Sequence, residues 1–115
     1  MKKAMIIIVA SLGLLIACSK DPKTTSSTVD CSGPAKSFST DVNPIIQSSC
    51  ATNSSCHGSG SQNGPGEMLT YSEIFNARSA IRSAVISGLM PKNGSLTAAQ
   101  KNSILCWIDN GALHN

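Results

Sequence analysis

The chain has 115 residues, of which 41% are hydrophobic and only 3% aromatic, and its formal net charge is +3. This length allows one small domain, whose limited apolar core would often need a disulfide or a cofactor for stability. Without Lys2 and Lys3, the nine basic residues become seven, against six acidic ones. This balance gives no basic patch, so we expect no nucleic-acid partner.

The N-terminus has the layout of a secretory signal. Two lysines precede an apolar run over residues 4–17, which is shorter than the about 20 residues that span a bilayer. The run ends Leu-Ile-Ala-Cys (15–18), which resembles the lipobox at which bacterial lipoproteins are cleaved and acylated. We therefore expect residues 1–17 to be a lipoprotein signal peptide. A lipidated Cys18 would anchor the protein to a bacterial membrane in the cell envelope, in the periplasm or at the surface. A plain signal peptide with a chance cysteine is the alternative.

Residues 18–30 are mostly small and polar, without apolar periodicity, and this pattern predicts a flexible tether. The folded domain is then expected to comprise residues 31–115. Its aromatic residues are Phe38, Tyr71, Phe75 and Trp107. A bound group could therefore supply apolar bulk that the side chains lack.

Three amphipathic segments predict an all-α domain, and no segment is typical of a strand. The first helix is expected after the capping residues 39–41, with Val42, Ile45 and Ile46 on its apolar face. The second is expected from about residue 71 to residue 87, either continuous or broken near residue 79, and Gly88 would end it.

The third helix is the most clearly delimited. Thr97 and Gln100 have the spacing of a capping box, and Gly111 marks the end. Its apolar stripe contains residues 104, 105, 107 and 108. The segment 58–66 between the first two helices is rich in Gly, Ser, Asn and Pro, and it predicts a loop.

Cysteine and histidine lie side by side in Ser-Ser-Cys-Ala-Thr-Asn-Ser-Ser-Cys-His-Gly (48–58). Cys56, His57 and the upstream Cys50 have the residue types of a Cys-x-x-Cys-His haem-attachment motif, but here five residues separate the cysteines. At about 100° per residue, a continuous helix would place the two thiols on different faces. The polar residues 52–55 suit a break, because their side chains compete for backbone hydrogen bonds.

Several arrangements of this cluster remain open. The insertion could loop out so that both cysteines attach a haem, or Cys56 could attach it alone while Cys50 pairs elsewhere. A zinc site could be assembled on paper from Cys50, Cys56, His57 and Cys106. However, an adjacent cysteine and histidine rarely reach one tetrahedral ion, and an exported protein meets a more oxidising environment than cytosolic zinc fingers do.

The order of these parts resembles the c-type cytochrome domain, in particular the short lipoprotein versions of Bacteroidetes-type bacteria. The resemblance covers nearly the whole predicted domain and depends on order and spacing, because no single string is specific. The matching strings are FSTDVNPIIQSSC (38–50), CHG (56–58), MP (90–91), LTAAQ (96–100) and CWIDNGA (106–112).

The resemblance implies a haem c held by thioether bonds from Cys50 and Cys56. It implies that His57 supplies the proximal nitrogen to iron and Met90 the distal sulfur, a ligand pair suited to one-electron transfer. The first and last helices would cross through Ile45, Ile46 and Trp107. Met68 is the rival sulfur, although its position favours core packing, and His114 is the rival nitrogen, in a part of the chain where a solvated side chain is usual.

The resemblance also implies a disulfide between Cys31 and Cys106, which would close a loop of about 75 residues and contribute about 4 kcal/mol to stability. Pairing of Cys50 with Cys106 is the alternative.

The sequence therefore predicts an electron carrier that serves redox partners in the envelope, rather than an enzyme. Tyr71, Glu67 and Glu73 lie near neither a second histidine nor a nucleophile–base pair in the sequence. Two other functions remain open. One is a cofactor-free, disulfide-stapled interaction domain on a lipid anchor. The other is a pentacoordinate haem sensor or peroxidase-like protein, if Met90 does not bind iron.

Overall fold

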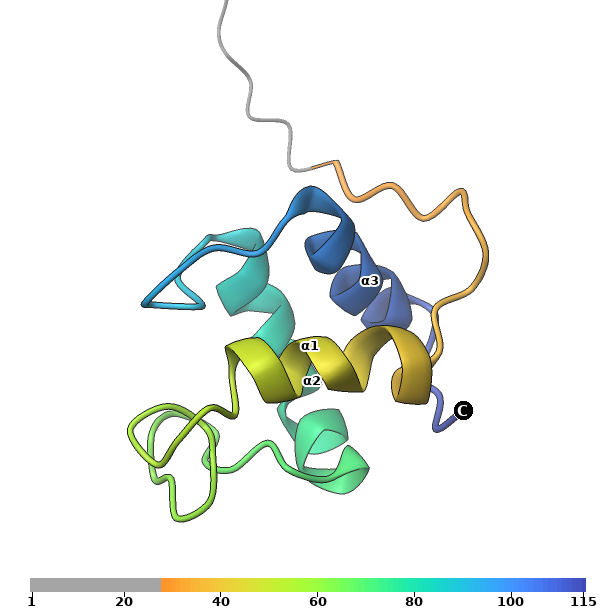
Figure 1. The fold of residues 1–115 in the computed structure, drawn as a ribbon. Helices are drawn as coiled ribbons and strands as arrows, with labels where there is room; N and C mark the ends of the chain where they lie inside the picture. Colours follow the sequence, from red (N-terminus) through yellow and green to blue (C-terminus); the bar gives the residue numbers. More distant parts are fainter. Residues whose placement is uncertain (1–27) are drawn as a thin grey trace, which may run out of the picture.

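A computed structural model describes residues 28–115, so the predicted signal peptide, Cys18 and most of the tether lie outside the described residues. The chain forms a π-helical turn η1 (Phe38–Val42) that continues into α1 (Asn43–Ser49), followed by α2 (Tyr71–Ile86) and α3 (Ala98–Asp109), as Figure 1 shows. Over residues 28–115 there is no β-strand. The prediction of an all-α domain with three helices is confirmed for the secondary structure of these residues.

The first helical segment begins earlier than predicted, at Phe38 instead of after residue 41. Ser37 is its N-cap, and the Ser37 Oγ atom accepts a hydrogen bond from the Thr40 N–H at 3.3 Å. Asp41 Oδ2 accepts from the Ser37 N–H at 2.8 Å. This reciprocal pairing satisfies donors that a helix start leaves free, so the predicted capping residues lie within the first turn.

The second helix is continuous from Tyr71 to Ile86, so no break occurs near residue 79. It begins with a capping box, in which Thr70 Oγ1 accepts from the Glu73 N–H at 3.3 Å and Glu73 Oε2 accepts from the Thr70 N–H at 2.8 Å. The backbone hydrogen bonds that this carboxylate accepts lower the pKa of Glu73. Gly88 follows the helix end with φ of +72°, the left-handed conformation that glycine adopts readily.

The predicted capping box of the third helix is confirmed. Thr97 Oγ1 accepts from the Gln100 N–H at 3.1 Å, and Gln100 Oε1 accepts from the Thr97 N–H at 2.9 Å. The helix ends at Asp109, and Gly111 has φ of +99°.

Trp107 is the centre of the packing between α3 and the first helical segment. Its ring lies 5.5 Å from the Phe38 ring, and only 1% of Trp107 is exposed. The expected crossing through Ile45 and Ile46 is therefore only partly right. Ile46 is fully buried, whereas Ile45 is partly exposed, and α3 packs mainly on η1 and α2. The contact with η1 is made through the ring of Phe38, which meets the Trp107 ring.

Residues after α3 fold back over this aromatic cluster. Trp107 Nε1–H donates to the Leu113 carbonyl and Tyr71 O–H to the Ala112 carbonyl, both at 2.8 Å. The His114 ring stacks on Tyr71 with 4.0 Å between centroids, and Asn115 Oδ1 accepts from the Phe38 N–H at 2.9 Å. His114 is exposed, as expected for a solvated side chain, and its stacking on Tyr71 holds the ring in place.

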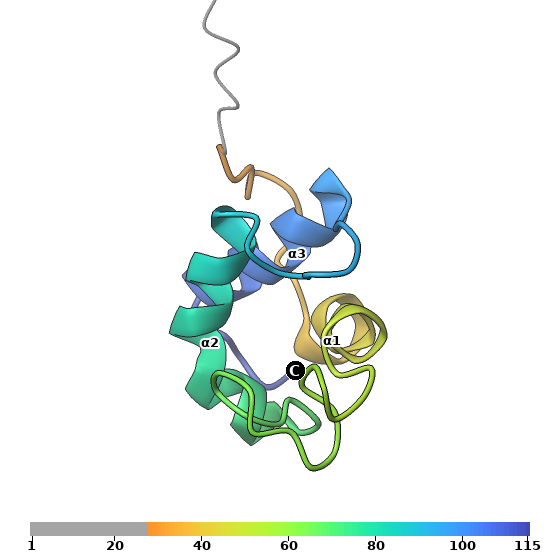
Figure 2. The same cartoon turned by 90° about the vertical axis from the view of Figure 1, so that its left-hand side faces the viewer.

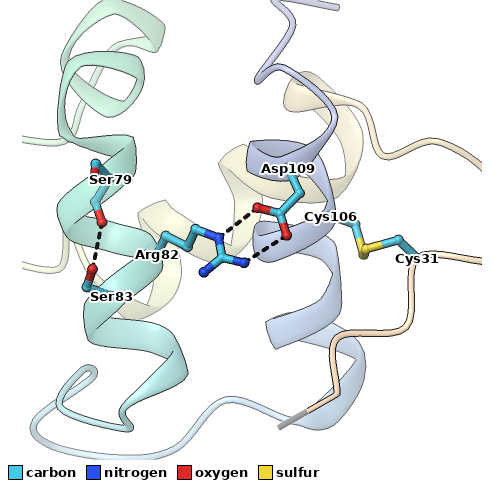
Figure 3. Close-up of polar contacts among 6 residues, drawn as sticks. All are labelled: Cys31, Ser79, Arg82, Ser83, Cys106 and Asp109. Atoms are coloured by element: carbon cyan, nitrogen blue, oxygen red, sulfur yellow. Dashed lines mark hydrogen bonds and ion pairs between the residues drawn. A yellow bond between two sulfur atoms is a disulfide. The ribbon is translucent and has the colours of Figure 1, made fainter.

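A disulfide joins Cys31 to Cys106, with 5.5 Å between Cα atoms (Figure 3). It ties the segment that precedes η1 to α3, and Val29 packs against the core beside it. Because Cys106 is used in this bond, the alternative pairing of Cys50 with Cys106 does not occur.

Arg82 on α2 and Asp109 at the end of α3 form a two-point ion pair, with Nε–Oδ1 and Nη2–Oδ2 distances of 2.7 and 3.0 Å (Figure 3). The hydrogen bond from Arg82 lowers the pKa of Asp109. The stabilisation is therefore present above the unfolded-state pKa of about 3.9 and is lost as the pH falls through the lower folded-state pKa.

We expect Asp109→Asn to lower the free energy of unfolding slightly at pH 7 and to make no difference once Asp109 is protonated in the native wild type. The effect is small because both side chains are more than a third exposed, at 40% and 36%, and solvent screens the pair. Urea denaturation of both proteins at pH 7 and at about pH 2 measures this. An equal deficit at both pH values would show that the loss comes from packing instead of charge.

Candidate functional site

After α1 the chain forms a short loop whose two ends are hydrogen-bonded to each other. The His57 N–H donates to the Cys50 carbonyl at 3.0 Å, so residues 51–56 are looped out between these two backbone groups. Asn53 holds the tip, because its carbonyl accepts from the Cys56 N–H at 3.0 Å and from the Gly58 N–H at 2.8 Å. The predicted helix break between the cysteines is thus present, and it takes the form of the looped-out insertion.

Gly58 allows this loop to close. A Cβ atom at this position would lie 2.8–2.9 Å from the N, Cα and C atoms of Asn53, which is closer than carbon atoms normally approach. The contact is with backbone that two hydrogen bonds hold, so it cannot be relieved by a side-chain rotation.

We expect Gly58→Ala to destabilise the domain by about 1–3 kcal/mol, the usual cost of inserting an atom into packed structure. Urea denaturation of the variant measures the loss. Gly33→Ala is the matched control, because nothing lies within 4 Å of a Cβ atom there. Equal stability of the Gly58 variant and the control would show that the loop is free to open.

His57 is held so that one ring nitrogen is used and the other is available. Only 6% of the residue is exposed, and Nδ1 lies 2.9 Å from the Gly66 carbonyl. A carbonyl oxygen can only accept, so Nδ1 must carry the proton and Nε2 of the neutral ring carries a lone pair. No hydrogen bond of the described residues uses Nε2. Among residues 28–115, no side-chain nitrogen or oxygen is both fully buried and without a hydrogen bond. Because Nε2 has no hydrogen bond, it must therefore keep some access to solvent.

The Gly66 carbonyl is placed by its own loop. The Gly66 N–H donates to the Asn63 carbonyl at 2.9 Å, and Gly66 has φ of +88°, a conformation that favours glycine. The Met68 N–H then donates to the His57 carbonyl at 2.9 Å. The sequence prediction missed the role of Gly66, because the Gly-Pro-Gly cluster at 64–66 indicated only a loop.

Cys50 and Cys56 are both partly buried, and neither is in a disulfide. The pKa of Cys50 is raised, first by burial and then by the charge that Cys56 would carry as a thiolate. The hydrogen bond from the His57 N–H to the Cys50 carbonyl places the backbone of Cys50 next to that of Cys56 and His57, although the sequence spacing departs from the usual motif.

The two methionines occupy different environments. Met68 is 4% exposed and belongs to the hydrophobic core, as its position predicted. Met90 is partly buried in the loop between α2 and α3, where its N–H donates to the Ala84 carbonyl at 3.2 Å. The loops that carry His57 and Met90 lie at opposite ends of α2 on one side of the molecule, the side that faces the viewer in Figure 2.

The zinc hypothesis is not supported. Cys106 is bonded to Cys31, so it is not free to join Cys50, Cys56 and His57. Within residues 28–115, no three or more His, Cys, Asp or Glu side chains are grouped so that they could hold a metal ion.

Comparisons with known protein families, with curated proteins and with solved structures found no match for this chain.

Proposed function

We propose that this protein is a haem c-binding electron-transfer lipoprotein of the bacterial cell envelope. The observation that carries the proposal is the environment of His57. Its Nδ1 is paired with the Gly66 carbonyl at 2.9 Å and its Nε2 has no protein partner, while two unbonded cysteines lie beside it. A histidine fixed through one nitrogen by a carbonyl is the usual arrangement for a metal-ligating imidazole.

The residues of the chain fit the attachment of a haem. The thiols of Cys50 and Cys56 would be the attachment points, since the backbone hydrogen bond from His57 to Cys50 holds the two ends of the looped-out insertion together. His57 Nε2 would be the proximal ligand and Met90 Sδ the distal one. When bound, the haem iron would cycle between its ferrous and ferric states and carry one electron at a time, and a thioether ligand raises the potential.

The distribution of aromatic side chains supports the same proposal. All four aromatic residues belong to one cluster between η1, the start of α2 and the end of α3: Phe38, Tyr71, Phe75 and Trp107. The loops that carry His57 and Met90 contribute no Phe, Tyr or Trp residue. A haem bound between these loops would add the aromatic bulk that they lack.

A lipid anchor at Cys18 and a tether over residues 18–30 complete the proposal; Cys18 and most of the tether lie outside the described residues. No helix within residues 28–115 has the length and apolar character needed to cross a membrane. An acylated Cys18 would hold the domain at the membrane surface, where envelope redox proteins would exchange electrons with it.

We expect haem to remain with the protein after denaturation and extraction with acidified acetone, when the chain is produced in a host with a haem c ligation system. Thioether bonds survive this treatment, whereas ligation by His57 and Met90 does not. The alkaline pyridine haemochrome spectrum then distinguishes a haem with one thioether bond from a haem with two. We expect the two-thioether spectrum for the wild type and the one-thioether spectrum for Cys50→Ala. Complete loss of colour to the solvent would contradict covalent attachment.

A cofactor-free interaction domain is the alternative that a specific observation favours. The Cys31–Cys106 disulfide and the backbone hydrogen bonds of loop 50–68 are contacts within the protein that would stabilise such a domain. A folded, colourless protein from the same host would support this alternative. Covalent haem that binds carbon monoxide readily would instead support a pentacoordinate sensor or a peroxidase-like protein, with Met90 unbound.

A further inference from the structure

The sequence contains three asparagines that are followed directly by glycine: Asn63, Asn93 and Asn110. Asparagine is a thermolabile residue, because the backbone nitrogen of the next residue can attack its side-chain amide carbon and close a five-membered ring. Glycine favours this attack, since it has no Cβ atom to block the approach and its backbone adopts many conformations. The residue types alone therefore give the three asparagines the same chemistry.

Asn93 is the one of the three that the fold leaves free to react. It belongs to the loop between α2 and α3, where residues 92–95 are all exposed. Within residues 28–115, neither the Asn93 side-chain amide nor the Gly94 N–H makes a hydrogen bond. Gly94 has φ of +141°, and a Cβ atom there would meet nothing within 4 Å. Both reacting groups are therefore accessible, and nothing packs on Gly94 to oppose their approach.

Hydrogen bonds hold the other two asparagines back from this reaction. Asn63 Nδ2 donates to the Ser55 carbonyl at 2.8 Å, so the side chain must release this bond before its amide carbon can be attacked. At the end of α3, the N–H of Gly111, which follows Asn110, donates to the Ile108 carbonyl at 3.1 Å. This nitrogen must lose its proton to become a nucleophile, and the hydrogen bond opposes that loss. Both sites therefore have to open locally before they react.

We propose that Asn93 is a modification site at which the folded protein deamidates spontaneously to aspartate and isoaspartate, with water as the co-reactant. The product carboxylate is ionised at neutral pH, because aspartate has a pKa of about 3.9, so the modification places a negative charge next to Lys92. Isoaspartate also reroutes the main chain through the former side-chain methylene. Both changes occur in the loop that carries Met90. The modification requires no haem, so it does not rest on the proposed function.

The reaction transfers no electrons. The Gly94 nitrogen gives up its proton and bonds to Asn93 Cγ, while the bond from Cγ to Nδ2 breaks and ammonia leaves with that proton. Water then adds to one of the two carbonyl carbons of the resulting succinimide and opens the ring. Opening at one carbonyl leaves aspartate, and opening at the other leaves isoaspartate. One water is consumed and one ammonia is released for each asparagine converted.

The test incubates the full, folded chain in mildly alkaline buffer and follows each asparagine by mass spectrometry of peptides prepared at acidic pH. We expect Asn93 to convert at least about tenfold faster than Asn63 and Asn110, because the latter two must first open locally. With urea and a thiol reductant in the same buffer, the three rates should become similar, since unfolding removes the hydrogen bonds that protect Asn63 and Asn110.

Asn93→Gln and Asn63→Gln are a matched pair of variants, because a glutamine would have to close a less favourable six-membered ring. Isoelectric focusing of the aged, folded chain should lose its new acidic band in the Asn93 variant and keep it in the Asn63 variant. Equal conversion of the three asparagines in the folded chain would overturn the proposal, as would faster conversion of Asn63 or Asn110. So would an unchanged Asn93 in the folded chain over a period in which the unfolded chain converts it.

Discussion

Replacing Met90 with alanine should abolish the weak near-infrared sulfur-to-iron band of the oxidised, haem-loaded protein and lower its reduction potential. The thioether is a soft ligand that favours ferrous iron, so its loss favours the ferric state. Met90 belongs to the loop between α2 and α3, and this loop lies on the same side of the molecule as the loop between α1 and α2 (Figure 2). Near-infrared absorption and a redox titration of the wild type and the variant measure the two effects.

Met68→Ala is the matched control, since it removes the sulfur of the other methionine in residues 28–115, whose N–H donates to the His57 carbonyl. Met68 is 4% exposed in the core, so the truncation should cost about 2–5 kcal/mol of stability and leave the band in place. Loss of the band in the Met68 variant, with the band kept in the Met90 variant, would transfer the ligand role to Met68. A wild type with no such band would contradict the His57–Met90 ligand pair.

Removing the disulfide should strongly lower the free energy of unfolding. The bond joins residues 75 positions apart, and on the chain-entropy model a loop of this length contributes about 4 kcal/mol. A small domain has only about 5–15 kcal/mol in total. The double variant Cys31→Ser/Cys106→Ala should therefore unfold at a much lower urea concentration, and alanine at position 106 avoids placing a hydroxyl where only 3% of the residue is exposed.

Wild type unfolded in the presence of a thiol reductant is the control, and it should show a similar loss. A deficit below about 1 kcal/mol in both would contradict the prediction. It would mean that apolar packing of Val29 holds the N-terminal segment without help from the covalent bond.

The helix caps were predictable where their partners are close in sequence. Thr97 and Gln100 pair across three residues, so the residue types alone predicted the start of α3 correctly. The start of the first segment was missed because Ser37 competes with residues 39–41 as N-cap, and Asp41 favours Ser37 by accepting its N–H. Both candidates have suitable side chains, and only the path of the chain before η1 decides between them.

The candidate site likewise has some features that the sequence predicted and others that only the tertiary structure decided. The sequence by itself determined which groups are available near residue 57: two thiols, one imidazole and a polar segment unable to continue a helix. The tertiary structure decided that the insertion loops out from Cys50 to His57, and that the Gly66 carbonyl occupies Nδ1. Hydrogen bonds to backbone carbonyls depend on the direction of the chain and not on side-chain type, so no residue pattern identifies their partners.

The packing of the first and last segments was also decided by tertiary structure. The apolar periodicity correctly predicted that Ile46 and Trp107 are buried, but not that Phe38 would meet Trp107 at 5.5 Å. It also could not predict that residues 112–115 return to bind Tyr71 and Phe38. Periodicity shows which side of a helix is apolar. The element that covers that side depends on how distant segments share the few large side chains of a small core.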